Sequence, residues 1–130
     1  MTRKLFALTL CALAGALILV ACGGGGAPAT SAPEARLVAV SAADFTFTPN
    51  AYTAAVGEQL TFNVKNDGTL DHNFVVLDAS GGELERLDAI SVGTTKALNF
   101  SPTAAGTLTI VCDVAGHREA GMEASFTVSQ

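Results

Sequence analysis

The sequence predicts an all-β domain over residues 37–130, a sandwich or barrel of about seven or eight short strands. Two observations carry this prediction. Several short segments alternate apolar with small or polar side chains, the pattern of half-buried strands. The segments between them are rich in Gly, Pro, Asn, Asp and Ser, the composition of turns. No internal repeat is visible, so we expect one small domain.

The strands follow one another at the spacing typical of such a domain. The clearest alternation runs through residues 60–64 and 108–111. Strands are expected at residues 37–40, 45–47, 59–64, 73–77, 97–100, 107–111 and 124–128. Residues 83–90 are compatible with either a short helical turn or a loop, and the sequence does not decide between them.

A leader precedes this domain. Two basic residues are followed by an apolar run over residues 5–21, the pattern of a secretory signal peptide. At about 17 residues the run is shorter than the roughly 20 that a membrane-spanning helix needs. It ends in Leu19-Val20-Ala21-Cys22, which resembles the lipobox of bacterial lipoproteins, where the cysteine is lipidated and becomes the new N-terminus. The alternatives are a plain signal peptide with a chance cysteine and an uncleaved anchor.

The residues after Cys22 predict a flexible tether. Four consecutive glycines lead into a stretch of Ala, Pro, Ser and Thr that cannot bury a core. The expected organisation is therefore a signal peptide over 1–21, a lipidated cysteine and flexible linker over 22–36, and the folded domain over 37–130. The expected location is outside the cytoplasm, with the lipid in the cell membrane or outer membrane and the domain in the periplasm or at the cell surface.

The charge balance argues against two kinds of partner. Two of the seven Lys and Arg residues lie in the leader, which leaves five basic against 12 acidic residues, a formal net charge of −7. Nucleic-acid binding is disfavoured because it requires a basic surface. Electrostatic adhesion to anionic lipid is disfavoured for the same reason, so membrane attachment is expected through the lipid alone.

The cysteines leave one thiol in the folded domain. Of the three, Cys11 lies in the leader and Cys22 is expected to carry lipid, so only Cys112 remains and no internal disulfide can form. Environments outside the cytoplasm oxidise thiols. A lone thiol there is expected to be protected or to be used.

One loop brings that thiol together with two other metal donors. Cys112 follows the predicted strand 107–111, and His117 and Met122 follow at regular spacing before strand 124–128. His72 stands just before strand 73–77. Each residue alone is more often structural than functional. If these strands are neighbours, however, the four side chains meet at one end of the sheet. Two imidazoles, a thiolate and a weak axial thioether form the donor set of a blue copper site.

On these residues the sequence resembles the cupredoxin family. It is most similar to the rusticyanin, sulfocyanin and auracyanin members, which share the spacing Cys-x-x-x-x-His-x-x-x-x-Met. The resemblance implies a Greek-key β-sandwich in which His72, Cys112, His117 and Met122 bind one type 1 copper ion. It also implies that Asn73 steadies the ligand loop and donates a backbone hydrogen bond to the thiolate.

The sequence departs from the family pattern at three positions. Ala115 stands where the family often has proline, Leu108 where an aromatic residue is common, and Ala124 near a frequent glycine. None of these departures removes a ligand.

The resemblance implies an electron carrier, with His117 nearer to solvent as the exit path. Its partners would be a redox donor and a redox acceptor, and the protein is expected to be a monomer. The alternative is a copper-binding carrier or buffering module. An enzyme is not expected, because copper reductases and oxidases need further histidines and a Cys–His hydrolase needs a third orienting group. Zinc could bind two imidazoles and a thiolate, but Met122 would then have no role.

Overall fold

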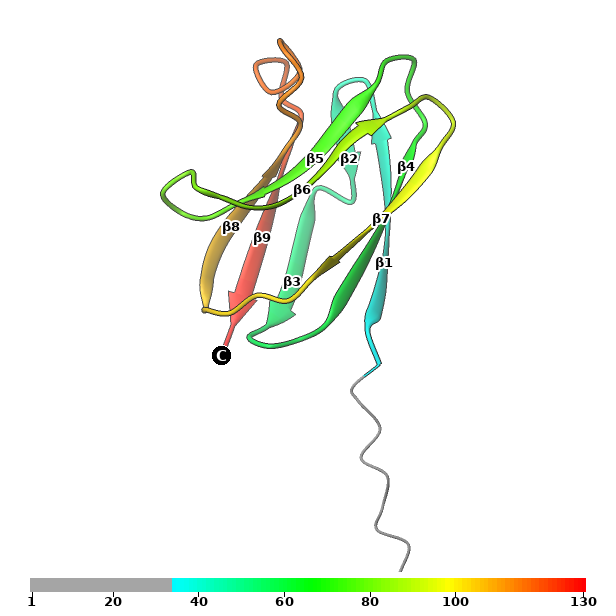
Figure 1. The fold of residues 1–130 in the computed structure, drawn as a ribbon. Coiled ribbons are helices and arrows are strands. Elements are labelled where there is room, and N and C mark those ends of the chain that lie inside the picture. Colours follow the sequence, from blue (N-terminus) through cyan, green and yellow to red (C-terminus); the bar gives the residue numbers. More distant parts are fainter. Residues whose placement is uncertain (1–33) are drawn as a thin grey trace, which may run out of the picture. The chain divides into compact units, whose positions relative to one another are not determined.

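The computed structural model describes residues 34–130, and this part of the chain contains nine β-strands and no helix (Figure 1). The strands are β1 Arg36–Ala43, β2 Thr46–Thr48, β3 Ala51–Ala55, β4 Leu60–Asn66, β5 His72–Leu77, β6 Glu83–Ile90, β7 Thr95–Phe100, β8 Gly106–Val111 and β9 Glu123–Ser129. No segment of residues 34–130 forms a helix that could span a bilayer. The predicted signal peptide, the lipidation of Cys22 and nearly all of the predicted tether lie outside the described residues.

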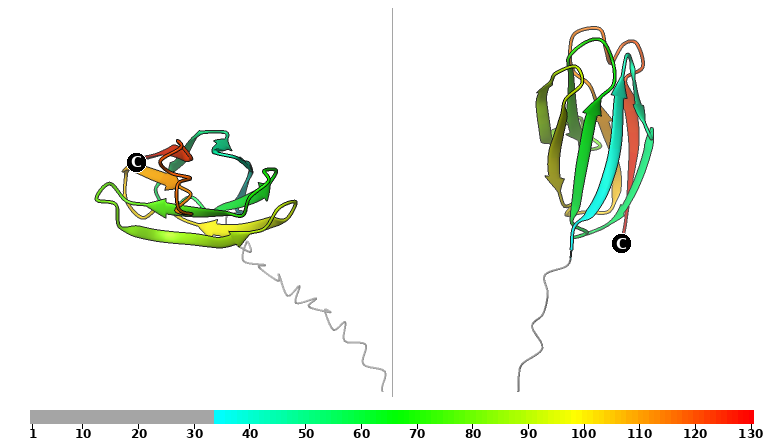
Figure 2. Two further views of the ribbon diagram at one scale, coloured as in Figure 1. Left: turned by 90° about the horizontal axis from the view of Figure 1, so that it is seen from above. Right: turned by 90° about the vertical axis from the view of Figure 1, so that its right-hand side faces the viewer.

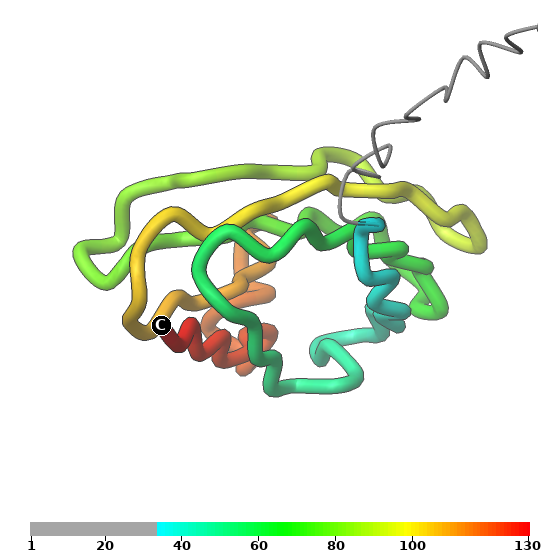
Figure 3. The backbone as a smooth tube through the Cα atoms, turned by 90° about the horizontal axis from the view of Figure 1, so that it is seen from below, coloured from blue at the N-terminus to red at the C-terminus, as the bar shows by residue number. Residues whose placement is uncertain are grey.

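The strands form two sheets that face each other (Figure 2). One sheet has the order β2-β1-β4-β7 and the other the order β3-β9-β8-β5-β6. The pairs β1–β4 and β3–β9 are parallel, and the remaining pairs are antiparallel. The view from below shows the backbone of the two layers on either side of a central region (Figure 3). The buried hydrophobic residues of both sheets form one core cluster. The prediction of an all-β sandwich is confirmed.

Two strands were not expected from the sequence. β6 occupies the segment left open between a helical turn and a loop, and it pairs antiparallel with β5 at the edge of its sheet. Most of its side chains are exposed and many are charged, a composition that discourages pairing with another chain at a sheet edge. β3 contains three alanines, which have little strand preference, and pairs in parallel with β9. In both cases the partner strand decides the conformation.

Aromatic rings fill the body of the sandwich. Phe62 is fully buried, and its ring lies 5.3–5.9 Å from the ring centres of Tyr52, Phe74 and Phe126. Two of these three contacts are edge-on, an arrangement that aromatic rings favour. Full burial of such a side chain stabilises the fold by about 1.5–3 kcal/mol. We call this apolar cluster the body of the sandwich.

Three connections meet at one end of the sandwich. β5 begins and β8 ends at the same end, because the two strands are antiparallel with Val75 opposite Val111. The β1–β2 turn, the β4–β5 loop and the β8–β9 loop lie together at the upper end of Figure 1. We call this region, made of residues 44–45, 66–72 and 112–122, the histidine end.

Candidate metal centre

Three of the four predicted ligands converge at the histidine end. His72 Nδ1 lies 3.2 Å from His117 Nδ1, and Cys112 Sγ lies 3.9 Å and 3.4 Å from these two nitrogens. All three side chains are buried, His72 and Cys112 completely and His117 with 5% of its surface exposed. Cys112 is a free thiol. Residues 40 and 45 positions apart from His72 are thus brought into direct contact with it.

The separations suit one small ion between the three donors. A metal held at about 2.0 Å from nitrogen and about 2.3 Å from sulfur in a trigonal arrangement separates its donors by roughly 3.5 Å to 3.7 Å. The observed spacings of 3.2–3.9 Å bracket this range. A soft thiolate with two imidazoles suits copper. The residues therefore fit one copper ion.

The position of His72 is fixed by the start of β5, and its ring is oriented by a carboxylate on the side away from the other two donors. It is the first residue of β5 and pairs with Ile90. Its Nε2 lies 3.0 Å from Asp44 Oδ1. Burial lowers the pKa of His72, and the hydrogen bond to Asp44 opposes this shift. The lowered pKa favours the neutral ring, the form that binds metals.

The β8–β9 loop, residues 112–122, is closed by its own backbone. The N–H of Cys112 donates to the carbonyl of Met122 at 3.1 Å, and the N–H of Met122 donates to the carbonyl of His117 at 3.0 Å. Gly116 and Gly121 have φ angles of 83° and 102°, a backbone conformation that residues with a side chain rarely adopt. The spacing of the three predicted ligands thus matches a compact loop with two glycines at its tight turns.

Met122 lies at the base of this loop. Its side chain is fully buried in the core cluster, and its main chain is joined to Cys112 and to His117. Its main chain is therefore adjacent to two of the other predicted ligands, Cys112 and His117.

Asn73 links β5 to the loop by two hydrogen bonds and to β6 by a third. Its backbone N–H donates to Cys112 Sγ at 3.3 Å. Its amide nitrogen donates to Asp113 Oδ1 at 2.7 Å, and its amide oxygen accepts the N–H of Ala89 at 2.9 Å. Arg86 donates to the other oxygen of Asp113 at 2.5 Å. The hydrogen bond from Asn73, followed by Arg86, lowers the pKa of Asp113, so the carboxylate stays charged and holds the loop against β6.

Two site residues were missed by the sequence interpretation. Asp44 and Phe45 form the β1–β2 turn, and Phe45 packs edge-on against His117 with the ring centres 4.9 Å apart. Phe45 is 38% exposed, whereas His117 retains only 5% exposure. His117 is thus nearer to solvent than His72, but Phe45 lies beside it. The only sequence signals were the position of Asp44 at the break between two predicted strands and that of Phe45 at the start of the second, which in the structure begins one residue later, at Thr46.

Asp44 is itself held in place by the β4–β5 loop. The backbone N–H and the hydroxyl of Thr69 both donate to Asp44 Oδ2, at 2.9 Å and 2.6 Å. These two bonds are the main reason that the pKa of Asp44 lies below its usual value. The carboxylate is therefore ionised at neutral pH.

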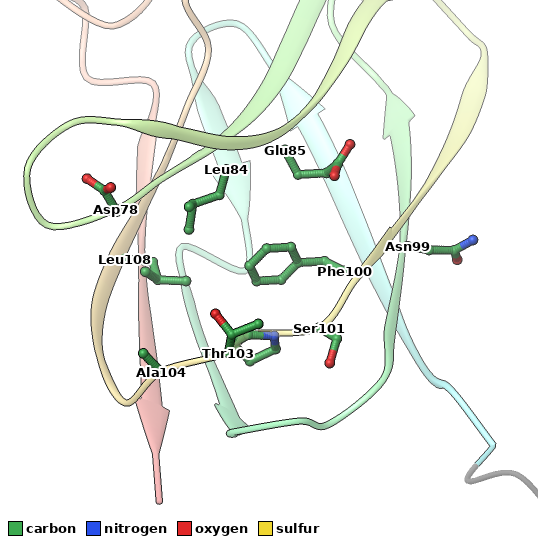
Figure 4. A pocket seen from close by; sticks show the side chains of 10 residues that line it. Asp78, Leu84, Glu85, Asn99, Phe100, Ser101, Thr103, Ala104 and Leu108 are labelled. Carbon is green, nitrogen blue, oxygen red and sulfur yellow. The ribbon is translucent and has the colours of Figure 1, made fainter.

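A separate surface pocket lies beside β6, β7 and β8 (Figure 4). Leu84, Phe100 and Leu108 form an apolar wall, and Asp78 and Glu85 supply carboxylates. None of the predicted site residues lines this pocket, and its lining contains no histidine, cysteine or methionine. The metal donors are gathered at the histidine end instead.

Comparisons with known proteins agree with the fold. A family model described as a cupredoxin-like domain matches residues 10–125. The solved structure of an auracyanin from the photosynthetic bacterium Roseiflexus castenholzii matches with a TM-score of 0.67, 15% identity, and coverage of 74% of this chain and 98% of that one. Auracyanin A from Chloroflexus aurantiacus, described as a "blue" copper protein, matches with a TM-score of 0.67, 18% identity, and coverage of 74% and 100%.

Reduced rusticyanin matches with a TM-score of 0.60, 19% identity, and coverage of 74% of this chain and 81% of that one. At these identities the solved structures support the fold. No curated protein matches the chain. With the family model extending over most of its length, the chain belongs to the cupredoxin-like domain family.

Proposed function

We propose that this protein is a type 1 copper protein that carries single electrons outside the cytoplasm. In this proposal His72, Cys112, His117 and Met122 bind one copper ion, and Asn73 supports them. The observation that carries the proposal is the buried cluster of His72 Nδ1, Cys112 Sγ and His117 Nδ1, whose donor atoms all lie within 4.8 Å of one another. When bound, copper supplies a one-electron couple between Cu(I) and Cu(II).

The chain's own residues favour fast and reversible exchange of one electron. The donors are buried and are held by the backbone of the loop and by the start of β5, so little motion is available to them. A site that moves little between oxidation states is suited to electron transfer. The N–H of Asn73 stabilises the thiolate of Cys112, and Met122 is the expected weak axial donor.

The composition favours a fixed site over copper delivery. The chain contains two histidines and two methionines, one of them Met1. Both histidines belong to the cluster, so none is left for exchangeable binding or for a second metal centre. This supports an electron carrier rather than a buffering module or a copper enzyme.

Membrane attachment is the second part of the proposal. Cys22 is proposed to carry the lipid and the residues from 22 to the start of β1 at Arg36 to serve as the tether, and the domain is proposed to meet its redox donor and acceptor as a monomer. Support comes from the sequence Leu19-Val20-Ala21-Cys22 and the glycine-rich segment after it. Mass spectrometry of the exported protein should find acyl chains on residue 22, and a Cys22→Ser variant should leave the membrane fraction. Wild-type protein in the soluble fraction would contradict this part.

The copper proposal is tested by spectroscopy and redox titration. Added Cu(II) should turn the protein intensely blue with a stoichiometry of one, and the colour should disappear and return over repeated cycles of reduction and reoxidation. The paramagnetic-resonance spectrum should be that of a type 1 site. A colourless Cu(II) complex would contradict the assignment. Rapid transfer of the metal to a chelator would instead favour the buffering module.

A further inference from the structure

An unassigned carboxylate stands behind one of the proposed ligands. Asp44 Oδ1 lies 3.0 Å from Nε2 of His72, while Nδ1 of the same ring faces His117 and Cys112. On the basis of the proposed function, we propose that Asp44 is a positioning residue, which accepts a hydrogen bond from Nε2–H of His72 and so presents the lone pair of Nδ1 to the metal.

Asp44 can act only as an acceptor in this position. Its Oδ2 receives two hydrogen bonds from Thr69, which leaves Oδ1 for His72. An ionised carboxylate has no proton to donate, so the hydrogen bond to His72 requires a proton on Nε2. A neutral imidazole carries one N–H, and Nδ1 is then the atom with the free lone pair. The carboxylate thereby selects the tautomer as well as the orientation of the ring.

A glycine leaves the space for this hydrogen bond. A Cβ atom at Gly68 would collide with Asp44 Oδ1 and would lie 2.8 Å from His72 Nε2. Any side chain at this position would therefore separate the two groups. The β4–β5 loop closes over the pair because residue 68 has no side chain.

The loop that contains Gly68 is fixed by a buried amide. Asn66 is fully buried; its oxygen accepts the N–H of Gly68 at 2.9 Å, and its nitrogen donates to the carbonyls of Leu70 and Ile90, each at 2.7 Å. All the hydrogen-bonding groups of this amide are engaged. The β4–β5 loop is thus held over the Asp44–His72 contact independently of any metal.

This contact has two consequences for metal binding. The ring of His72 is oriented before the metal arrives, so less order must be gained on binding. The negative charge behind the ring also makes Nδ1 a stronger donor, which favours Cu(II) over Cu(I) and lowers the reduction potential. Loss of such a supporting group typically weakens metal binding about 10- to 100-fold.

The neighbouring Asp71 provides a matched control. It directly precedes His72, but its side chain makes no hydrogen bond within residues 34–130, and it acts on His72 through its charge alone. Asp71→Ala and Asp44→Ala therefore remove the same charge close to the same ring. Only Asp44→Ala also removes the hydrogen bond to Nε2.

The experiment compares the two variants in the full chain, purified in mild detergent without metal and under a thiol reductant. Long-range proton–nitrogen correlation spectra at neutral pH report which nitrogen of His72 carries the proton. The wild type and Asp71→Ala should show a single form with the proton on Nε2. Asp44→Ala should show a mixture of the two tautomers. Asp44→Ser, whose hydroxyl is too short to reach the ring, replaces Asp44→Ala if that variant does not fold.

Copper titration then completes the comparison. With copper(II) sulfate as the probe and the thiol reductant removed beforehand, Asp44→Ala should bind about 10- to 100-fold more weakly than Asp71→Ala and should have a higher potential. An Asp44→Ala protein that keeps the proton on Nε2 of His72 in a single form would overturn the role of Asp44, whatever its affinity for copper. The tautomer measurement needs no copper, so it still decides the role of Asp44 if the blue copper proposal fails.

Discussion

Buried side chains differ in kind between the body of the sandwich and its histidine end. The body is filled by apolar residues such as Phe47, Phe62 and Phe126, all nearly or fully buried. Apart from the buried hydroxyl of Tyr52 in the body, the buried polar groups of the side chains in the described part of the chain belong to Asn66, His72 and His117, and all three residues lie at the histidine end. One region is therefore held by the hydrophobic effect, and the other depends on each polar atom finding a partner.

The difference shows that the histidine end contains buried polar groups that lower the stability of the fold but can bind a metal. Burying a polar group is unfavourable unless it is hydrogen-bonded. Asn66 satisfies its amide within the β4–β5 loop, whereas Nδ1 of His72 and of His117 face each other and a thiol instead of solvent. Such an arrangement is explained by a metal ion that the two imidazoles and the thiol share. The body, in contrast, needs no ligand to be stable.

The Cys112→Ser substitution should have the largest effect, and it tests whether the histidine end can lose its chemistry while the body stays folded. The change replaces sulfur by oxygen at a fully buried position, so the blue colour should be lost completely because the thiolate-to-copper interaction is gone. The far-ultraviolet circular dichroism should remain that of a β-sandwich. A blue colour that survives the substitution would show that Cys112 is not the thiolate ligand.

Phe62→Ala tests the body in the opposite way. Removal of this fully buried ring should reduce the free energy of unfolding of the metal-free protein by about 3–5 kcal/mol. The absorption spectrum of the copper-loaded protein should keep its blue band while the protein is folded. Urea titration measures the first quantity, and Leu37→Ala, at a side chain that is 70% exposed, is the control that should change it little. A colourless but folded Phe62→Ala protein would contradict the separation of the two regions.

Met122→Leu is a milder change within the histidine end. Leucine has nearly the same volume, so the fold should lose less than about 1.5 kcal/mol and copper should still bind. The reduction potential should rise, because an axial donor that stabilises Cu(II) is lost. Redox titration against the wild type measures the shift. A lower potential would count against Met122 as the axial ligand.

Asp78 gives the smallest expected effect, at a turn outside both regions. Its Oδ1 accepts hydrogen bonds from the hydroxyl and the N–H of Ser80 and from the N–H of Gly82. The hydroxyl of Ser80 is the main cause of its lowered pKa. A lowered carboxyl pKa stabilises the folded state at pH values above the ordinary value of 3.8, and this contribution is lost as the pH falls through the lowered value.

Comparing the wild type with Asp78→Asn tests whether the charged carboxylate of Asp78 stabilises the folded protein at neutral pH. The urea midpoint of the wild type should be higher at neutral pH, and the two proteins should converge in strong acid. The copper spectrum should not change in either. A difference that persists in strong acid would show that the hydrogen bonds of the turn matter and the charge does not.

The local sequence pattern was sufficient to predict most of the strands. Residues 60–64 and 108–111 alternate clearly, and both lie in strands. β6 was not recognised because its apolar residues are interrupted by Glu, Arg and Asp without the two-residue alternation of a strand, and only pairing with β5 makes it one. β3 was missed because alanine has little strand preference, and its partner β9 lies far away in the sequence.

The sequence by itself predicted the metal-donor set. The spacing of Cys112, His117 and Met122 within one loop is local information, and His72 is the other histidine of the chain. Only the tertiary structure placed Asp44 and Phe45 at the site. Asp44 is one of 12 acidic residues, and no local pattern distinguishes it. Its contact with His72, 28 positions away, depends on how the β1–β2 turn and the β4–β5 loop pack together, and that packing is a property of the folded sandwich.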